Sequence, residues 1–108
     1  MKYYSTNGNA PIADLNKAVV KGLAEDRGLY MPERINQLPK EFFDNIEKMS
    51  FQEIAYTVAC AFFGEDVDLD SQLDIVNDTL SFDCPVEKVK DNIYTLELFH
   101  GPTLAFKD

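Results

Sequence analysis

The chain has 108 residues, of which 45% are hydrophobic and 27% are charged. This length suffices for one hydrophobic core but not for two, and the composition excludes a disordered chain. A formal net charge of −9 argues against nucleic acid and membrane surfaces as partners, because phosphate backbones and anionic bilayers would repel it. The longest apolar run, Ile54 to Phe63, is too short to cross a bilayer, and the N-terminal residues lack a signal-peptide pattern. We therefore expect a soluble, cytoplasmic protein.

Two groups of residues that suggest a metal site have simpler explanations. Cys60 and Cys84 do not have metal-ligand spacing, and we interpret them as reduced structural thiols of a cytosolic protein. The acidic cluster from Glu65 to Asp70 alternates like a calcium loop, but it lacks the central glycine and the closing glutamate of an EF-hand. We interpret the cluster as a solvated helix start and expect no metal.

The N-terminal residues predict a strand, a helix and a second strand. Lys2 to Thr6 is rich in β-prone side chains, and the turn signal Asn7-Gly8 follows it. Asp14 precedes apolar residues at helical spacing and predicts an N-capped amphipathic helix. Leu29 to Met31 predicts a short extended segment. The apolar face of the helix consists of Leu15, Ala18, Val19, Gly22 and Leu23.

Two helices are predicted in the middle of the chain. Pro39 suits the first turn of one helix, whose apolar face includes Phe43. Ser50 and Glu53 form the S-x-x-E pattern of a capping box and predict the start of the next helix, which Gly64 ends. Because this second helix is apolar on nearly every side, we expect it to be central.

A further helix and a hairpin complete the predicted α+β fold, which is small and mostly helical. The helix starts at Asp68 or Asp70. Two β-prone segments then flank the polar junction Lys90 to Asn92, which predicts a hairpin whose second strand runs from Ile93 to Phe99. The inner face of the helix consists of Leu69, Leu73, Val76 and Leu80.

The last residues carry the one amine of chemical interest, on Lys107. The apolar segment from Leu98 to Asp108 has nothing to pack against unless more protein follows, so we expect it to fray or to self-associate. Gly101 and Pro102 break the preceding strand, and Thr103 can cap a helix whose first turn holds Lys107. A helix N-terminus and apolar neighbours disfavour the ammonium form, as a Schiff-base lysine requires.

The chain resembles the threonine synthase family, which consists of fold-type II α/β enzymes that use pyridoxal phosphate. The segment LELFHGPTLAFKD, Leu96 to Asp108, is similar to the family signature in which the lysine of FKD binds the cofactor covalently. The segments YYST, from Tyr3, and AVVKGLAEDRGLYMPE, from Ala18, are similar to the family's N-terminal strand, helix and turn. Asn7 departs from the arginine of many members, so no phosphate contact is carried over to it.

The resemblance implies a division of the chain and a role for two side chains. Residues 1–84 would be the N-terminal domain, and residues 85–108 would begin the cofactor-binding catalytic domain. Lys107 would be the catalytic and cofactor-binding residue of a phospho-lyase that converts O-phospho-L-homoserine and water into L-threonine and phosphate. Phe106 would either lie against the cofactor ring or pack in the core. The family's chain runs on well past this lysine, so we expect the 108 residues alone to lack cofactor and activity.

Two other hypotheses remain open. The chain could be a non-enzymatic helical interaction module whose apolar tail docks a partner. It could also come from a catalytically dead paralogue of the same family. The codons that follow Asp108 in the source genome distinguish the first of these from an enzyme.

Overall fold

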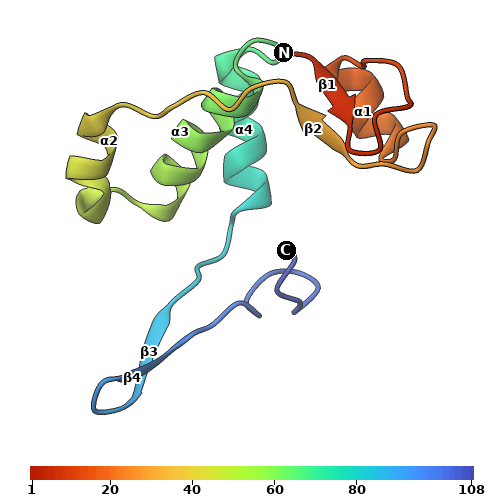
Figure 1. The fold of residues 1–108 in the computed structure, drawn as a ribbon. Coiled ribbons are helices and arrows are strands. Elements are labelled where there is room, and N and C mark those ends of the chain that lie inside the picture. Colours follow the sequence, from red (N-terminus) through yellow and green to blue (C-terminus); the bar gives the residue numbers. More distant parts are fainter.

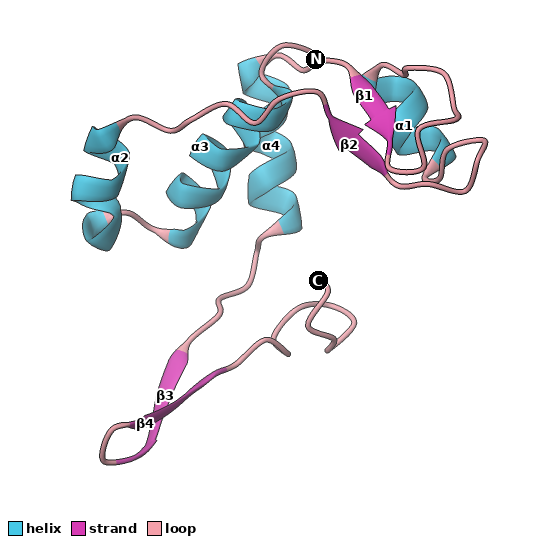
Figure 2. Ribbon diagram, in the orientation of Figure 1, coloured by secondary structure: helices cyan, strands magenta, loops and turns pink.

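The computed structural model describes residues 1–108 and contains four α-helices, a short 3-10 helix and two separate two-stranded sheets (Figure 1, Figure 2). In chain order the elements are β1 (Tyr3–Ser5), α1 (Leu15–Lys21), β2 (Tyr30–Pro32), α2 (Lys40–Asn45), η1 (Ile46–Lys48), α3 (Phe51–Phe63), α4 (Leu69–Thr79), β3 (Val86–Lys90) and β4 (Ile93–Leu96). This arrangement confirms the predicted small, mostly helical α+β fold. No helix is both long enough and apolar enough to cross a membrane.

The N-terminal unit consists of β1, α1, β2 and the loops between them. The two strands are antiparallel, with Tyr4 opposite Met31. The Asp14 carboxylate caps α1 by accepting a hydrogen bond from the backbone N–H of Lys17 at 2.8 Å. The helix ends before Gly22, whose φ of 73° suits glycine. The predicted apolar face is wrong at Val19 and Leu23, which are 70% and 50% exposed.

The helical layer consists of α2, η1, α3 and α4, and its predicted helix starts are confirmed. Ser50 and Glu53 form the capping box of α3: the Ser50 hydroxyl accepts from the Glu53 N–H at 3.2 Å, and the Glu53 carboxylate accepts from the Ser50 N–H at 2.7 Å. Gly64 ends this helix. The carboxylate of Asp68 caps α4 by accepting from the Ser71 N–H at 2.9 Å.

The predicted apolar face of α2 is wrong. Pro39 precedes the helix, and Phe42 is buried with 8% of its surface exposed, whereas Phe43 is 58% exposed. The helix has six residues and passes directly into η1, so the spacing of apolar residues samples less than two turns. Contacts with the rest of the chain therefore decide which of the two adjacent rings is buried.

The inner face of α4 is confirmed at Val76, and Leu80 is partly buried at the groove beside α3. Val76 is 7% exposed, but Leu69 and Leu73 are 58% and 43% exposed. Gln72 takes a buried position at 3% exposure, where its side-chain N–H donates to the Val67 carbonyl at 2.7 Å and its Oε1 has no hydrogen-bond partner. Polar side chains that find a hydrogen-bond partner can thus replace apolar ones at a helix interface.

The helix α3 lies between α2 and α4, as its composition predicts (Figure 1). No residue of α3 is fully buried, however. A groove of about 510 Å³ between α3 and α4 is lined almost entirely by apolar side chains, including Ile54, Val58, Phe62 and Val76. The helix is therefore central in the layer but open on one side.

The C-terminal segment, residues 85–108, projects from the helical layer as a hairpin followed by turns (Figure 1). The strands β3 and β4 are antiparallel and connected through Asp91 and Asn92, with a bulge between Lys88 and Lys90. Asn92 has a φ of 59°, which asparagine tolerates better than most residues. The hairpin is confirmed, but β4 ends at Leu96 instead of Phe99, and every strand residue is exposed.

The whole chain exposes more surface than a compact protein of its size. Its accessible surface is 8009 Å², whereas a compact monomer of its mass exposes about 6,100 Å². Its radius of gyration is 16.8 Å, against about 13 Å for a compact domain of this length. Only 9 of 108 residues are buried, and so the chain by itself forms a small core.

Candidate functional site

The predicted helix at Thr103 is absent. Residues 101–108 form hydrogen-bonded turns, in which the Leu104 N–H donates to the Gly101 carbonyl at 3.1 Å and the Asp108 N–H donates to the Ala105 carbonyl at 3.2 Å. Leu104 has a φ of 61°, outside the helical region. A helix of so few residues forms too few hydrogen bonds to offset the cost of its nucleus, which explains the difference from the prediction.

Asp108 closes these turns in place of a helix cap. The backbone N–H of Thr103 donates to Asp108 Oδ2 at 2.8 Å, and the Thr103 hydroxyl donates to Asp108 Oδ1. The hydrogen bonds from Thr103 lower the pKa of the Asp108 carboxyl. Gly101 is buried against this side chain, and a Cβ at Gly101 would lie only 2.4 Å from the Cβ of Asp108. Only glycine fits there without a shift of Asp108.

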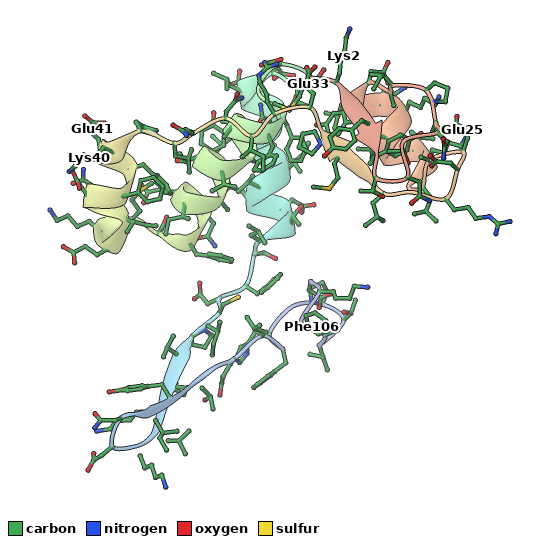
Figure 3. All side chains as sticks on the ribbon, viewed as in Figure 1. Lys2, Glu25, Glu33, Lys40, Glu41 and Phe106 are labelled. Atoms are coloured by element: carbon green, nitrogen blue, oxygen red, sulfur yellow. The ribbon has the colours of Figure 1, made fainter.

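The predicted catalytic lysine, Lys107, lies within these turns on their exposed side. Its amine forms none of the hydrogen bonds or ion pairs of the structure. Neighbouring Phe106 is 77% exposed. Figure 3 labels it at the C-terminal turns. The helix N-terminus that the sequence predicts beside the amine is therefore absent from this chain.

Apolar neighbours are present on one side of Lys107. A cavity of about 280 Å³ is lined by Lys107 and Phe106 together with Phe51 of α3, Phe82 of the link between α4 and β3, and Leu98, which follows β4. The C-terminal turns and the helical layer therefore border the same cavity. The apolar environment predicted for the amine is thus partly formed.

His100 has local partners that fit a structural role. Its Nε2 lies 2.6 Å from a carboxylate oxygen of Glu97, and its ring centroid lies 4.7 Å from that of Phe99. No serine or cysteine is paired with it. Nor do any three histidine, cysteine or acidic side chains in the chain come close enough together to hold a metal ion.

A polar cluster in the N-terminal unit was not predicted from the sequence. The carboxylate of Asp26 accepts hydrogen bonds from the Ser5 hydroxyl at 2.5 Å, the Asn9 N–H at 2.8 Å and the Gly28 N–H at 3.0 Å. The bond from Ser5 is the main cause that lowers the pKa of Asp26. Ser5 is 2% exposed, and a Cβ on Gly28 would lie 2.0 Å from its hydroxyl oxygen. The spacing of Asp26 two residues before Gly28 is a turn signal that sequence reasoning can use.

Comparisons with known proteins match the chain along its whole length. Residues 2–80 match the family model described as threonine synthase N terminus. Threonine synthase from Schizosaccharomyces pombe is 36% identical over 114 residues, which cover 100% of this chain and 22% of that protein. Threonine synthase from Escherichia coli is 32% identical over 108 residues, which cover 100% of this chain and 25% of that protein.

Two solved structures have the same fold over these residues. The crystal structure of PLP-bound threonine synthase from Brucella melitensis matches with a TM-score of 0.85 and 38% identity, covering 99% of this chain and 24% of that one. The crystal structure of the Escherichia coli enzyme matches with a TM-score of 0.88 and 31% identity, covering 99% of this chain and 25% of that one. The chain therefore spans about a quarter of the length of these relatives. It belongs to the threonine synthase family and corresponds to the N-terminal region of its members.

Proposed function

We propose that these residues are the N-terminal quarter of an enzyme that converts O-phospho-L-homoserine and water into L-threonine and phosphate, and that Lys107 is its cofactor-binding lysine. The observation that carries the proposal is the similarity of the whole chain, at 31% to 38% identity, to threonine synthases of known structure. The signature-like segment from Leu96 to Asp108 lies within the matched residues, and its penultimate residue, Lys107, carries an exposed amine without a partner.

The residues beside Lys107 fit pyridoxal phosphate at its ring and aldehyde. The amine is free of carboxylate partners, and the adjacent cavity offers the apolar side chains of Phe82, Leu98 and Phe106 to a flat ring. The chain contains no glycine-rich loop for the phosphate. Lys107 would hold the cofactor, and Phe106 would lie against its ring. Holding the phosphate falls to residues outside these 108.

Lys107 would also move protons during the reaction. When bound, pyridoxal phosphate supplies an electron sink for the carbon atoms of the substrate. The Lys107 amine would take a proton from the substrate as a base and return it later as an acid. The backbone of this lysine lies in the turns at residues 101–108, which follow the hairpin along the chain.

We further propose that the chain divides into residues 1–84 and residues 85–108, the second part being the start of the catalytic domain. No hydrogen bond or ion pair joins the two parts. The hairpin of the second part is exposed on both faces, and an isolated two-stranded hairpin is marginal in water. Further strands of a larger sheet would cover it.

We infer that the isolated 108-residue chain is inactive and self-associates through its apolar tail. Leu98, Phe99, Leu104 and Phe106 are between 40% and 77% exposed. Water excludes such side chains, which favours contact between copies. Sedimentation of the purified chain measures this association. A cytoplasmic location is part of the same proposal, because Cys60 and Cys84 are unpaired thiols that suit a reducing compartment.

The test uses the gene from its source genome with all coding sequence that follows Asp108. We expect this gene to restore growth without threonine to an Escherichia coli strain that lacks threonine synthase. Lys107→Ala should abolish cofactor attachment and lower the turnover of the purified protein at least a thousand-fold, which is on the order of the loss of a proton-transferring residue. Lys90→Ala, which removes an exposed amine from β3, is the matched control.

Three results would change the proposal. Cofactor attachment and product formation that survive in Lys107→Ala would show that this lysine has no catalytic role. Cofactor attached at Lys107 without any turnover would identify a catalytically dead member of the family. A stop codon directly after Asp108 would favour the interaction module, for which the open apolar groove between α3 and α4 is the candidate surface.

A further inference from the structure

One side chain closes residues 101–108 into a loop. Asp108 accepts two hydrogen bonds from Thr103, five residues earlier, one from the backbone N–H and one from the hydroxyl. The Asp108 N–H in turn donates to the carbonyl of Ala105. The absence of a side chain at Gly101 lets Asp108 approach closely. Three contacts thus converge on a residue that no part of the reaction described above requires.

The closed loop restrains the backbone on either side of Lys107. Asp108 follows Lys107 directly, and its side chain and N–H are both bonded within the loop. The side chain of Lys107, by contrast, is exposed and has no polar partner of its own. The direction of the amine therefore depends on how the loop holds the backbone, because no contact of the lysine side chain fixes it.

We propose that Thr103 and Asp108 are positioning residues for the Lys107 amine. The inference rests on the proposed function, in which this amine binds the cofactor. A carboxylate with two aligned acceptor oxygens is needed to take both donors of Thr103. Lys107 lines the apolar cavity together with Phe82 and Phe106, so the loop holds this lysine beside the cavity. A lysine with a fixed backbone reaches the reacting carbon with a smaller entropic cost.

The chain allows a graded set of substitutions. Asp108→Asn replaces one acceptor oxygen by an amide that donates, so one of the two bonds from Thr103 is lost. Thr103→Val keeps the shape and the backbone N–H but removes the hydroxyl bond. Thr103→Ser keeps both donors and serves as the conservative rescue. Asp91→Asn, at the exposed hairpin turn, is the control for the same chemical change at a distance from the loop.

The experiment uses the full protein from its gene, loaded with pyridoxal phosphate. The readouts are the visible circular dichroism of the bound cofactor, which reports its fixed orientation, and kcat and KM measured separately. We expect Asp108→Asn to lose more than half of the visible dichroism and to leave KM nearly unchanged. The variant should lower kcat about a hundred-fold, because a misplacement of the catalytic group by about 1 Å has an effect of that size. Thr103→Val should lie between Asp108→Asn and the parent, and Thr103→Ser should match the parent.

Unchanged dichroism and kcat in both Asp108→Asn and Thr103→Val would overturn the inference. If Asp108→Asn lowers the melting temperature, Thr103→Val decides, because it alters one hydroxyl only. Failure of the proposed function gives a different pattern, in which Lys107→Ala retains the cofactor. Loss of the cofactor in Lys107→Ala together with parental values in the two loop variants would leave the function standing and remove the positioning role.

Discussion

Residues 1–84 and residues 85–108 differ in the sequence separation of the groups that hold them together. In the first part, hydrogen bonds join residues far apart in the sequence. The Ser5 hydroxyl donates to Asp26 across 21 residues, and the Leu29 N–H donates to the Thr6 hydroxyl across 23 residues. Figure 3 shows Lys2 and Glu33 side by side. The Glu33 carboxylate accepts a hydrogen bond from the backbone N–H of Lys2, 31 residues earlier. These contacts define a tertiary structure.

In residues 85–108 the side-chain hydrogen bonds and ion pairs are local. His100 contacts Glu97, three residues away, and Thr103 donates to Asp108, five residues away. The candidate catalytic lysine is thus in the part of the chain with the least tertiary support. The comparison shows that long-range hydrogen bonds support residues 1–84, whereas the hairpin of residues 85–108 is exposed on both faces.

The largest expected effect on stability comes from a glycine in the first part. We expect Gly28→Ala to destabilise the chain by about 3 kcal/mol, because the new methyl group overlaps with buried atoms. A Cβ at Gly28 would lie 2.0 Å from Ser5 Oγ and 2.9 Å from the Asn7 backbone nitrogen. Urea unfolding followed by circular dichroism measures the difference. Gly101→Ala, in the local loop of the second part, is the comparison, and an equal loss from both would contradict the contrast between the two parts.

A matched pair of valines tests the same contrast in apolar packing. Val76 is 7% exposed on α4, and Val89 is 62% exposed on β3. We expect Val76→Ala to cost about 2 kcal/mol of unfolding free energy and Val89→Ala to cost less than about 0.5 kcal/mol in the 108-residue chain. Chemical denaturation of the two variants decides. In the full protein the cost of Val89→Ala should rise, and a cost that stays the same would argue that nothing packs on the hairpin.

A smaller effect is expected from the buried hydroxyl of the polar cluster. Ser5→Ala removes one donor to Asp26 and the acceptor of the Asn7 N–H, and should cost about 1.5 kcal/mol. The lowered pKa of Asp26 adds a pH dependence: its stabilising contribution is complete above the ordinary pKa and is lost as the pH falls through the lower folded value. The melting temperature of the parent should therefore fall in acid more steeply than that of Ser5→Ala. Parallel curves would show that this hydrogen bond does not couple to folding.

The smallest effect is expected from the amino group of Met1, which pairs with Glu65 at 3.2 Å and Asp66 at 2.9 Å. The hydrogen bond to Asp66 is the main cause that raises the pKa of this amine above its ordinary 8.0. Because the pKa is raised, the ion pairs of this amine contribute their full stabilisation below pH 8.0. That stabilisation is lost as the pH rises through the pKa of the folded state. The melting temperature should therefore decline slightly above pH 8.0. An acetylated N-terminus should remove this decline, and a decline that persists would have another origin.

Local rules predicted the elements well but not the side chains that become buried. The caps at Asp14, Ser50 and Asp68 involve groups within three residues, so their sequence patterns suffice. The choice between Phe42 and Phe43 depends on contacts from other elements, which spacing within a six-residue helix does not contain.

The candidate site was predicted in its residues but not in its local structure. The signature-like segment identified Lys107, whereas the helix expected at Thr103 is replaced by turns that Asp108 closes. The few residues after Thr103 do not offset the cost of a helix nucleus, and Thr103 bonds to the Asp108 side chain instead. The cluster around Asp26 was missed because its partners Ser5 and Asn9 are 21 and 17 residues away.

The most direct test of the account is the position of the cofactor on the protein. Borohydride reduction of the full protein loaded with pyridoxal phosphate fixes the cofactor to its lysine, and mass spectrometry of the digested protein then locates it. We predict that the label lies on Lys107, in the peptide that contains LELFHGPTLAFKD. A label on any other lysine, or a loaded active enzyme without label on Lys107, would contradict the assignment on which the proposed function depends.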